Sequence, residues 1–286
     1  MKRVLVTGAN GQLGKSIHRV APDYPELKFV FTDVVELDIT NNEEVNTFFE
    51  SNAFDYCINC AAYTAVDKAE KEVEKAYLIN ATAVKNLAEA CQTTGTVLIH
   101  ISTDFVFDGT KRTPYTEEDT PNPLSVYGKS KLKGEEYVQE ICERHFIVRT
   151  SWLYSEYGNN FVKTMLRLAE TRKQISVVND QIGSPTYAGD LAEFSLKVIS
   201  SGSTAYGLYH YSNLGAISWY DFAVEIFKQH KKEVRVVPIP TSSYPTAAKR
   251  PPFSVLDLQR GNKKMKSQIY FWDIRLSENK APLNSI

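Results

Sequence analysis

The stretch that decides the fold is TGANGQLG at residues 7–14, which begins where the apolar run RVLVT ends. Its glycines, Gly8, Gly11 and Gly14, stand between a predicted strand and a predicted helix. In such a loop the first glycine permits a tight turn, the second lets a pyrophosphate approach the backbone, and the third lets the helix pack closely on the strand. The N–H groups at the helix start then face the phosphates. The spacing G-x-x-G-x-x-G differs by one residue from G-x-G-x-x-G, so a glycine-rich turn without a ligand is the alternative interpretation.

An acidic residue decides between these two interpretations. Asp33 stands at the end of the second apolar run, LKFVFT, 19 residues after Gly14. A carboxylate there accepts hydrogen bonds from a ribose 2′-OH and repels a 2′-phosphate. The loop and the acid together predict a bound dinucleotide, with NADH favoured over NADPH. No Arg occurs in the adjacent segment TDVVELD, although a Lys or Arg from elsewhere could still contact a phosphate.

Short apolar runs alternate with helical stretches over the first half of the chain, a pattern that predicts a parallel sheet with crossover helices. Because the runs contain few polar residues, we expect helices on both faces and a doubly wound (Rossmann) α/β fold. A capping box from Thr40 to Glu43 predicts one helix start, and the segment SWYD after Leu214 predicts a second, at Ser218. A longer helix is expected from about Val73 to Cys91. The expected strands are RVLVT, LKFVFT, DYCIN, TVLIHIS and HFIVRT.

The character of the chain changes after Thr150, where aromatic and irregular segments begin. We therefore expect a dinucleotide-binding domain at residues 1–152, to which segments near 183–212 return. Residues 153–286 are expected to form mainly a smaller C-terminal α/β domain that binds the substrate.

Composition excludes several classes of protein. The 286 residues contain 33 Lys and Arg against 34 Asp and Glu, so neither nucleic acid nor a membrane surface is an expected partner. The first apolar stretch is too short for a signal peptide or a transmembrane span, so a cytoplasmic enzyme is expected. Four cysteines are too few for a disulfide scaffold. Cys57 and Cys60 would lie on opposite faces of a strand, which favours a structural role over a thiol function.

Candidate catalytic residues follow the fourth strand. Tyr127 and Lys131 are four residues apart at a predicted helix start, so they share one helix face. A tyrosine has a reference pKa of about 10, and a neighbouring ammonium would favour its phenolate. Thr103 ends the fourth strand at the carboxyl edge of the sheet, where doubly wound folds bind ligands. Its hydroxyl could polarise a substrate carbonyl, so the three residues predict a carbonyl reductase.

Several ordered segments also carry a resemblance. The sequence resembles the extended short-chain dehydrogenases/reductases, and among them the dTDP-4-dehydrorhamnose reductase family. This resemblance implies reduction of the C4 ketone of a dTDP-linked 4-keto-6-deoxy sugar by NADH or NADPH, giving dTDP-L-rhamnose for cell-surface polysaccharides. The matching segments, over most of residues 1–257, are TGANGQLG, INCAAYTAVDKAE, ISTDFVFDG, NPLSVYGKSKLKGE, RTSWLYSEYGNNFVKTMLRLA, NDQIGSPTYAGDLA and YPTAAKRPPFSVLD.

The resemblance assigns roles to particular residues. Thr103, Tyr127 and Lys131 would be catalytic, with Tyr127 as the proton donor and Lys131 also holding the nicotinamide ribose. Asp104 and Trp152 would contact the sugar, although a core position is the alternative for Trp152. Arg250 is the favoured ligand of the diphosphate, ahead of Lys163, for which a solvated helix face is expected. The implied cofactor contacts are Gly11, Gln12 and Leu13 at the pyrophosphate, Asp33 at the adenosine ribose, Asp38 and Ile39 at the adenine, and Ala62, Tyr63 and Thr64 along the cofactor.

Departures from the family pattern narrow these expectations. Some members dimerise through magnesium held by glutamates, whereas this chain has Ser16 and Gly189 at the corresponding places. No metal is therefore expected, and the chain could be a monomer or a homodimer. A nucleotide-sugar dehydratase needs a second carboxylate after Asp104, where this chain has Phe105. An epimerase of the same fold, or a regulatory subunit without catalysis, remains as an alternative.

Overall fold

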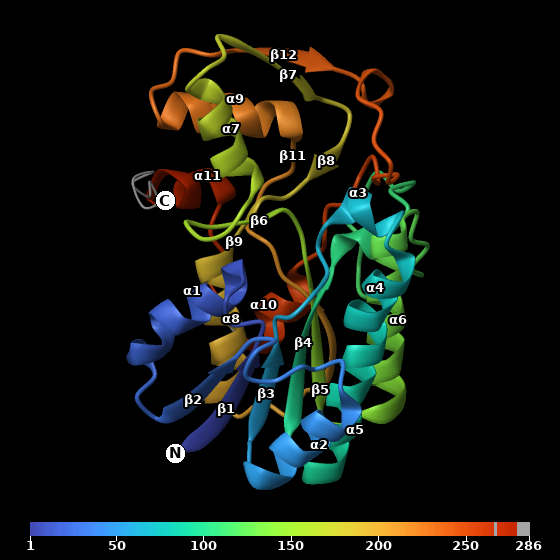
Figure 1. The fold of residues 1–286 in the computed structure, drawn as a ribbon. Helices are drawn as coiled ribbons and strands as arrows, with labels where there is room; N and C mark the ends of the chain where they lie inside the picture. Colours follow the sequence, from blue (N-terminus) through green and yellow to red (C-terminus); the bar gives the residue numbers. More distant parts are fainter. Residues whose placement is uncertain (266–267, 279–286) are drawn as a thin grey trace.

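Six parallel strands form the central sheet of the structure, a computed structural model that describes residues 1–265 and 268–278 (Figure 1). The sequence segment LNSI at the C-terminus lies outside the described residues. All five predicted strands are present, and a sixth joins them at one edge. In their order across the sheet they are β10 (Gly207–His210), β5 (His145–Thr150), β4 (Val97–Thr103), β3 (Tyr56–Asn59), β1 (Lys2–Thr7) and β2 (Leu27–Thr32).

The strand order reverses at β1, because β2 lies on one side of it and β3 on the other. Ligands of doubly wound folds bind beyond the carboxyl ends of the strands at this reversal. The glycine loop follows β1 at that point. The doubly wound fold predicted from the sequence is therefore confirmed, and residues 7–14 lie where such folds bind their ligands.

The two faces of the sheet bury different side chains. Val4 and Val6 of β1 pack on one face with α1 (Gln12–Val20) and α8 (Ala188–Ser200). Leu5 packs on the opposite face with α2 (Asn42–Ser51), α5 (Ala83–Thr94) and α6 (Val126–Ile141). Such alternation follows from the two-residue period of a strand.

Cys57 lies within β3 and Cys60 directly follows it, and the two side chains follow the same alternation. Cys57 belongs to the face with α5, whereas Cys60 packs against the face with α1. Both are free thiols, and burial raises the pKa of the Cys60 thiol. The predicted placement on opposite faces is confirmed.

A second cluster of elements lies beyond the carboxyl edge of the sheet, at the top of Figure 1. Its parallel pair is β7 (Gln174–Val178) with β12 (Arg235–Ile239). Around this pair lie α7 (Phe161–Ala169), α9 (Trp219–Gln229) and α11 (Trp272–Glu278). Two short strand pairs connect this region to the sheet: β6 (Leu153–Tyr154) with β9 (Thr186–Tyr187), and β8 (Ile182–Gly183) with β11 (Ile217–Ser218).

The chain passes repeatedly between these two regions. After α7 and β7 it returns to the sheet as α8 and β10, rises again to α9 and β12, and comes back as α10 (Gln259–Met265). The division into a dinucleotide-binding domain at residues 1–152 and a mainly substrate-binding domain at residues 153–286 stays a prediction. The remaining short elements are η1 (Ala21–Asp23), α3 (Val66–Ala69), α4 (Val73–Tyr77), η2 (Leu78–Thr82), η3 (Asp104–Val106) and η4 (Thr241–Ser243).

Helix starts test the capping predictions. Ser218 caps α9 and forms the predicted capping box with Asp221. The prediction for Thr40 was wrong by one residue: Asn41 caps α2 by accepting from the Glu44 N–H, while the Thr40 hydroxyl donates to Asp38. The long helix predicted from Val73 is present as α4 and α5, but η2 between them is a π-helical turn.

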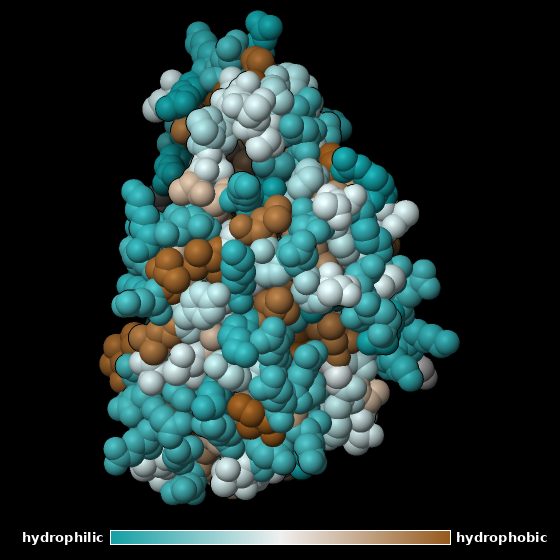
Figure 2. All heavy atoms as spheres, turned by 90° about the vertical axis from the view of Figure 1, so that its right-hand side faces the viewer, coloured by the Kyte–Doolittle hydropathy of each residue, from teal (hydrophilic) through white to brown (hydrophobic). Residues whose placement is uncertain are grey.

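The face of the molecule that carries α4 and α6 is mostly hydrophilic (Figure 2). Its apolar side chains occur in small separate groups. Among the described helices, none is both long and apolar enough to span a membrane.

Candidate active site

The glycine loop is shaped by close backbone packing. Gly8 has a φ of +64°, and a Cβ on it would lie 2.6 Å from the Ala61 nitrogen. A Cβ on Gly14 would lie 2.5 Å from the Ala9 Cα. Gly11, by contrast, would meet only the Gly8 oxygen, at 3.2 Å. Gly8 and Gly14 are therefore required by the packing of the protein itself, whereas an added Cβ at Gly11 would make a single tight contact.

The helix that follows this loop begins without a side-chain cap. Gly11 is the N-cap of α1 and has no side chain to accept from the first-turn amides, which include those of Gln12 and Leu13. An uncapped helix N-terminus with glycines before it is suited to bind the phosphates of a nucleotide. This geometry fits the dinucleotide predicted from the sequence.

The side chain of Gln12 links the glycine loop to the region beyond the sheet. Its Oε1 accepts hydrogen bonds from Ser155 Oγ at 3.1 Å and from Asn160 Nδ2 at 2.9 Å. Asn160 also caps α7 by accepting from the Lys163 N–H. The predicted cofactor loop and the predicted substrate region thus contact one another directly.

Asp33 lies beside the glycine loop, as the sequence predicted. Its Oδ2 accepts from the Asn10 N–H at 2.9 Å and its Oδ1 from the Val34 N–H at 2.9 Å. The side chain remains partly exposed, so it can also accept from a ribose hydroxyl. Asp38 and Ile39 follow in the same connection: Asp38 accepts from the Thr40 N–H, and Ile39 is buried with α2 and α5.

The segment after β3 joins the glycine loop to the catalytic residues. Ala61 contacts Gly8, and two residues later Tyr63 packs in a small cluster with Tyr127. The buried Asn80 in the π-helical turn fixes this segment, because it accepts from the Tyr63 N–H at 2.8 Å and donates to the Tyr63 oxygen at 3.0 Å. Of the other predicted cofactor contacts, Ala62 is partly buried and Thr64 is exposed.

Thr103 and Tyr127 meet at the carboxyl end of β4. Burial raises the pKa of Tyr127 to about 12, although the neighbouring Thr103 hydroxyl acts to lower it. Asp104 raises it further and accepts from the Thr103 hydroxyl at 3.1 Å. Burial also raises the pKa of Asp104 to about 6, although hydrogen bonds from Ser254 and Thr103 lower it. Tyr127 is therefore a protonated hydroxyl at neutral pH, ready to donate.

Lys131 lies one turn after Tyr127 on α6, as predicted, but its ammonium points elsewhere. Its Nζ donates to the Ile101 oxygen at 2.7 Å and lies 3.4 Å from His100 Nε2. Burial lowers the pKa of Lys131 to about 8, while Glu135 and Cys60 raise it. The expectation that Lys131 lowers the Tyr127 pKa is not met in this structure, because the amine is held against β4 rather than the phenol.

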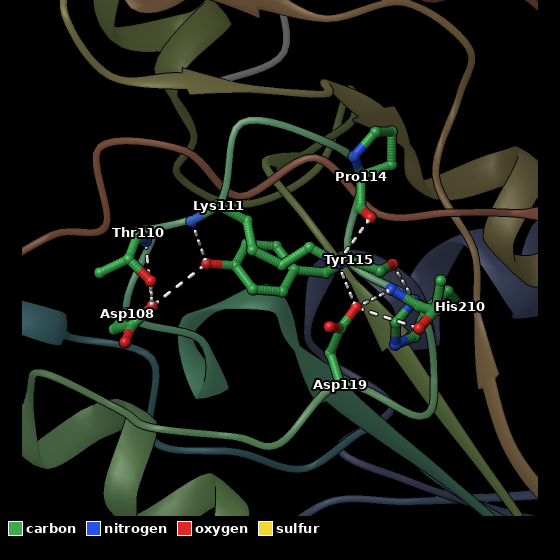
Figure 3. A network of polar contacts seen from close by, with 8 residues as sticks. Asp108, Thr110, Lys111, Pro114, Tyr115, Asp119 and His210 are labelled. Carbon is green, nitrogen blue, oxygen red and sulfur yellow. Dashed lines mark hydrogen bonds and ion pairs between the residues drawn. The ribbon is translucent and has the colours of Figure 1, made fainter.

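A polar network holds the loop that follows Thr103 (Figure 3). The Tyr115 hydroxyl donates to Asp108 at 3.1 Å, and Lys111 Nζ donates to Asp119 at 2.6 Å. His210 of the edge strand β10 lies with its Nδ1 3.1 Å from the main-chain carbonyl oxygen of Tyr115. Hydrogen bonds, chiefly from the Thr110 N–H, lower the pKa of Asp108 to about 2. Asp108 therefore stays ionised at neutral pH and helps to fix the loop of residues 108–119, which follows Asp104 and Phe105.

Trp152 lies in a strained position at the boundary of the two regions. Its φ of +45° is rare for a bulky residue. Its ring stacks on Trp219 with centroids 3.4 Å apart, and a Cβ on Gly183 would lie 2.5 Å from it. Backbone strain of this kind occurs at functional sites, and the partly buried ring packs at the edge of the second cluster.

The two candidate diphosphate ligands both have partners. Arg250 forms a bidentate ion pair with Asp67, with Nη2 2.6 Å from Oδ2 and Nη1 3.2 Å from Oδ1. Hydrogen bonding from Arg250 lowers the pKa of Asp67. Lys163 Nζ donates to the main-chain carbonyl oxygen of Glu156 at 3.2 Å. The lysine therefore lies in part-buried surroundings rather than on a solvated helix face.

No metal site is formed by the described residues: no three of their His, Cys, Asp or Glu side chains come together to hold an ion. Ser16 is buried, and its hydroxyl donates to the main-chain carbonyl oxygen of Gln12 at 2.9 Å. A Cβ on Gly189 would lie 2.3 Å from the Tyr187 ring. A glutamate at either position would thus require rearrangement.

Sequence reasoning missed the buried polar residues behind Lys131. Asn59 contacts His100 Nδ1 at 3.1 Å, and His100 in turn contacts Lys131. Beside them, Glu135 of α6 forms a buried ion pair with Arg149 of β5, at 2.6 Å between Oε2 and Nη2. The available signal was a polar residue inside an apolar strand, as in DYCIN and TVLIHIS.

Comparisons with known proteins agree with this geometry. The family model of the RmlD substrate binding domain matches residues 1–283. A dTDP-4-dehydrorhamnose reductase of Aggregatibacter actinomycetemcomitans is 44% identical over 98% of this chain and 99% of its own length. The structure of a dTDP-4-dehydrorhamnose reductase from Bacillus anthracis, in complex with NADP, has a TM-score of 0.93 and 45% identity, covering 98% of this chain and 99% of its own. The corresponding structure from Clostridium acetobutylicum has a TM-score of 0.93 and 46% identity, covering 97% of this chain and 98% of its own.

Proposed function

The chain belongs to the dTDP-4-dehydrorhamnose reductase family of oxidoreductases, and on that premise we propose that it reduces the C4 ketone of dTDP-4-dehydro-L-rhamnose with Tyr127 as the proton donor. The observation that supports this proposal most is the position of Tyr127 at the carboxyl end of β4, where its ring centroid lies 5.6 Å from that of Phe105, two residues after Thr103. It places one donor and one further hydroxyl where a doubly wound fold binds its ligand.

Bound at the glycine loop, a reduced nicotinamide dinucleotide would supply the hydride for C4. The uncapped amides at Gly11 and Gln12 would hold its pyrophosphate, and Asp33 would accept from the adenosine ribose. Asp33 favours NADH, while the B. anthracis relative was solved with NADP. We propose that NADH is used in preference, and a substitution at Asp33 described below tests this.

The chain's own residues would carry the proton chemistry. Thr103 would donate a hydrogen bond to the C4 oxygen and orient the carbonyl. Tyr127, held protonated by burial, would then donate its proton to the oxygen as the negative charge develops. Asp104 and Trp152 would contact the sugar. Lys131, on the same face of α6 as Tyr127, would hold the nicotinamide ribose.

The diphosphate of the substrate requires a cation, and Arg250 is the proposed one. A guanidinium can bind phosphate with two parallel hydrogen bonds, which is the same geometry that Arg250 makes with Asp67. Arg250 would therefore exchange one bidentate partner for another when the substrate binds.

A direct assay tests the reductase function. The pure protein, NADH or NADPH, and dTDP-4-dehydro-L-rhamnose should together lose absorbance at the nicotinamide band, and dTDP-L-rhamnose should accumulate. Omission of the keto sugar is the control. If neither cofactor is consumed, the reductase assignment fails. Tightly held NAD and conversion of a sugar without consumption of NADH would instead support an epimerase.

A second measurement concerns the nucleotide. Competition of dTDP, UDP, GDP and CDP for the substrate site should show preference for dTDP. Equal binding of all four would contradict a dTDP-linked substrate while leaving the carbonyl reduction intact.

A further inference from the structure

A row of buried polar side chains runs from β1 to α6 behind the catalytic residues. Thr7 donates to Asn59 Oδ1 at 2.7 Å, Asn59 Nδ2 contacts His100 Nδ1 at 3.1 Å, and His100 Nε2 lies 3.4 Å from Lys131 Nζ. All four are nearly inaccessible to solvent, with His100 at 0% and Lys131 at 2% exposure. The order of donors and acceptors along this row decides what His100 presents to Lys131.

The orientation of the Asn59 amide is fixed by a backbone group. The Ala61 N–H can only donate, and it lies 3.2 Å from Asn59 Oδ1. That atom is therefore the carbonyl oxygen, and the atom facing His100 is the NH₂ group. Asn59 must donate to His100 Nδ1.

The tautomer of His100 follows from this contact. An Nδ1 that accepts a hydrogen bond carries no proton, so a neutral ring has its proton on Nε2. Burial holds the pKa of His100 well below its usual value, and a charged Lys131 would lower it further, so the ring is neutral with Lys131 in either form. The Nε2–H therefore points at Lys131 Nζ.

A protonated lysine cannot accept this N–H, because an ammonium group has only donors. A neutral amine has one lone pair and can accept it. We infer that His100 is a positioning residue for Lys131, which holds the amine against β4 and favours its neutral form. This inference builds on the proposed catalytic role of Lys131 and goes beyond it.

Other groups near Lys131 act in the opposite direction. Glu135 and Cys60 would both favour the ammonium. Glu135, however, already accepts from Arg149 Nη2 at 2.6 Å and from the Ser102 hydroxyl. His145, the remaining titratable neighbour of His100, also disfavours a charged imidazole. His100 is thus the group whose hydrogen bond selects the neutral amine.

The consequence for the reaction is a lysine whose pKa lies closer to neutral pH than that of an exposed lysine. Burial lowers the pKa of Lys131 to about 8, and the His100 N–H acts in the same sense. An acid–base group works best when its pKa lies near the operating pH. Lys131 would then exchange protons at the site instead of remaining a fixed charge.

The test is a titration of Lys131 in the protein without cofactor or substrate. The protein is labelled with ¹³Cε-lysine, and the Lys131 resonance is assigned by its loss in Lys131→Met. In His100→Asn, the amide can still accept from Asn59 but no longer reaches Lys131. The pKa of Lys131 should rise by about one pH unit, which corresponds to the net strength of one hydrogen bond.

His210→Asn is the matched control, since His210 is also buried and neutral but lies on the edge strand β10, against Tyr115. It should leave the Lys131 titration unchanged. An unchanged titration in His100→Asn, or an equal rise in both variants, would overturn the inference.

A kinetic measurement completes the test. The limb of the kcat/KM profile that reports Lys131 should move to higher pH in His100→Asn by the same amount as the titration. A uniform loss of rate with an unmoved limb would indicate a merely structural histidine. Because the titration needs no turnover, it remains decisive even if the assay shows no reductase activity.

Discussion

The cofactor loop, residues 7–14 with Asp33, and the catalytic edge, formed by Thr103, Tyr127 and Lys131, lie at the same side of the sheet but are built differently. The loop is made by backbone: Gly8 and Gly14 are required because a Cβ would overlap neighbouring main-chain atoms. The catalytic edge is made by side chains, whose properties depend on burial and on partners from other strands and loops.

This difference explains why one region could be interpreted more completely than the other. Glycine spacing specifies backbone geometry over a few residues. The protonation state of Tyr127 depends instead on its burial in the folded chain, and then on Thr103 and Asp104, which lie more than twenty residues earlier. The segment after β3 connects the two regions, since Ala61 contacts Gly8 and Tyr63 packs with Tyr127. Substitutions should therefore be able to damage one region and spare the other.

The largest expected effect is on the catalytic edge. Tyr127→Phe removes the proton donor and should lower kcat by about 1000-fold, or about 4 kcal/mol in activation free energy. NADH binding, followed by nicotinamide fluorescence, should remain nearly unchanged. Tyr115→Phe is the control, because that hydroxyl contacts Asp108 outside the site. Turnover close to wild type in Tyr127→Phe would contradict the assigned role.

The next effect concerns the cofactor loop. Gly8→Ala combines a positive φ with a Cβ 2.6 Å from the Ala61 nitrogen, so we expect a loss of about 3 kcal/mol in the free energy of unfolding and weakened cofactor binding. The measurements are chemical denaturation and a binding titration.

Gly202→Ala isolates the contribution of close packing. Gly202 also has a positive φ, +62°, but no atom lies within 4 Å of the position that an added Cβ would take. The substitution should lower the free energy of unfolding by about 1 kcal/mol and leave cofactor binding intact. Equal losses of unfolding free energy in Gly8→Ala and Gly202→Ala would show that close packing at Gly8 contributes nothing to the cost of an added Cβ.

The smallest effect separates the two cofactors. Asp33→Ala should weaken NADH binding by about tenfold more than NADPH binding, because the carboxylate accepts from the 2′-OH and repels a 2′-phosphate. Asp33→Asn keeps the size of the side chain while it removes the charge, so it should relieve the repulsion of NADPH. An equal loss for NADH and NADPH in Asp33→Ala would mean that the acid does not distinguish the 2′ position.

Much of the fold was predictable from local patterns. The five predicted strands are present, and Ser218 caps its helix, because both depend on neighbouring residues. The error at Thr40 also has a local cause. The Thr40 hydroxyl donates a hydrogen bond to Asp38, and Asn41 is the N-cap of α2 instead. For the site, sequence patterns indicated Tyr127 and Lys131 but not His100 or Asn59, which act only through contacts across the sheet.

Local sequence was enough to establish the doubly wound sheet, the glycine loop and the resemblance to a reductase family, since spacing and strand periodicity are properties of neighbouring residues. Folding was needed to establish that Lys131 is turned to Ile101 and His100, that Arg250 is paired with Asp67, and that Gln12 joins the loop to Asn160. These contacts join residues 30 to 183 positions apart. Burial and hydrogen bonding between residues so far apart in the sequence arise only when the chain has folded. The sequence could therefore identify these residues, but their partners and protonation states depend on the tertiary structure.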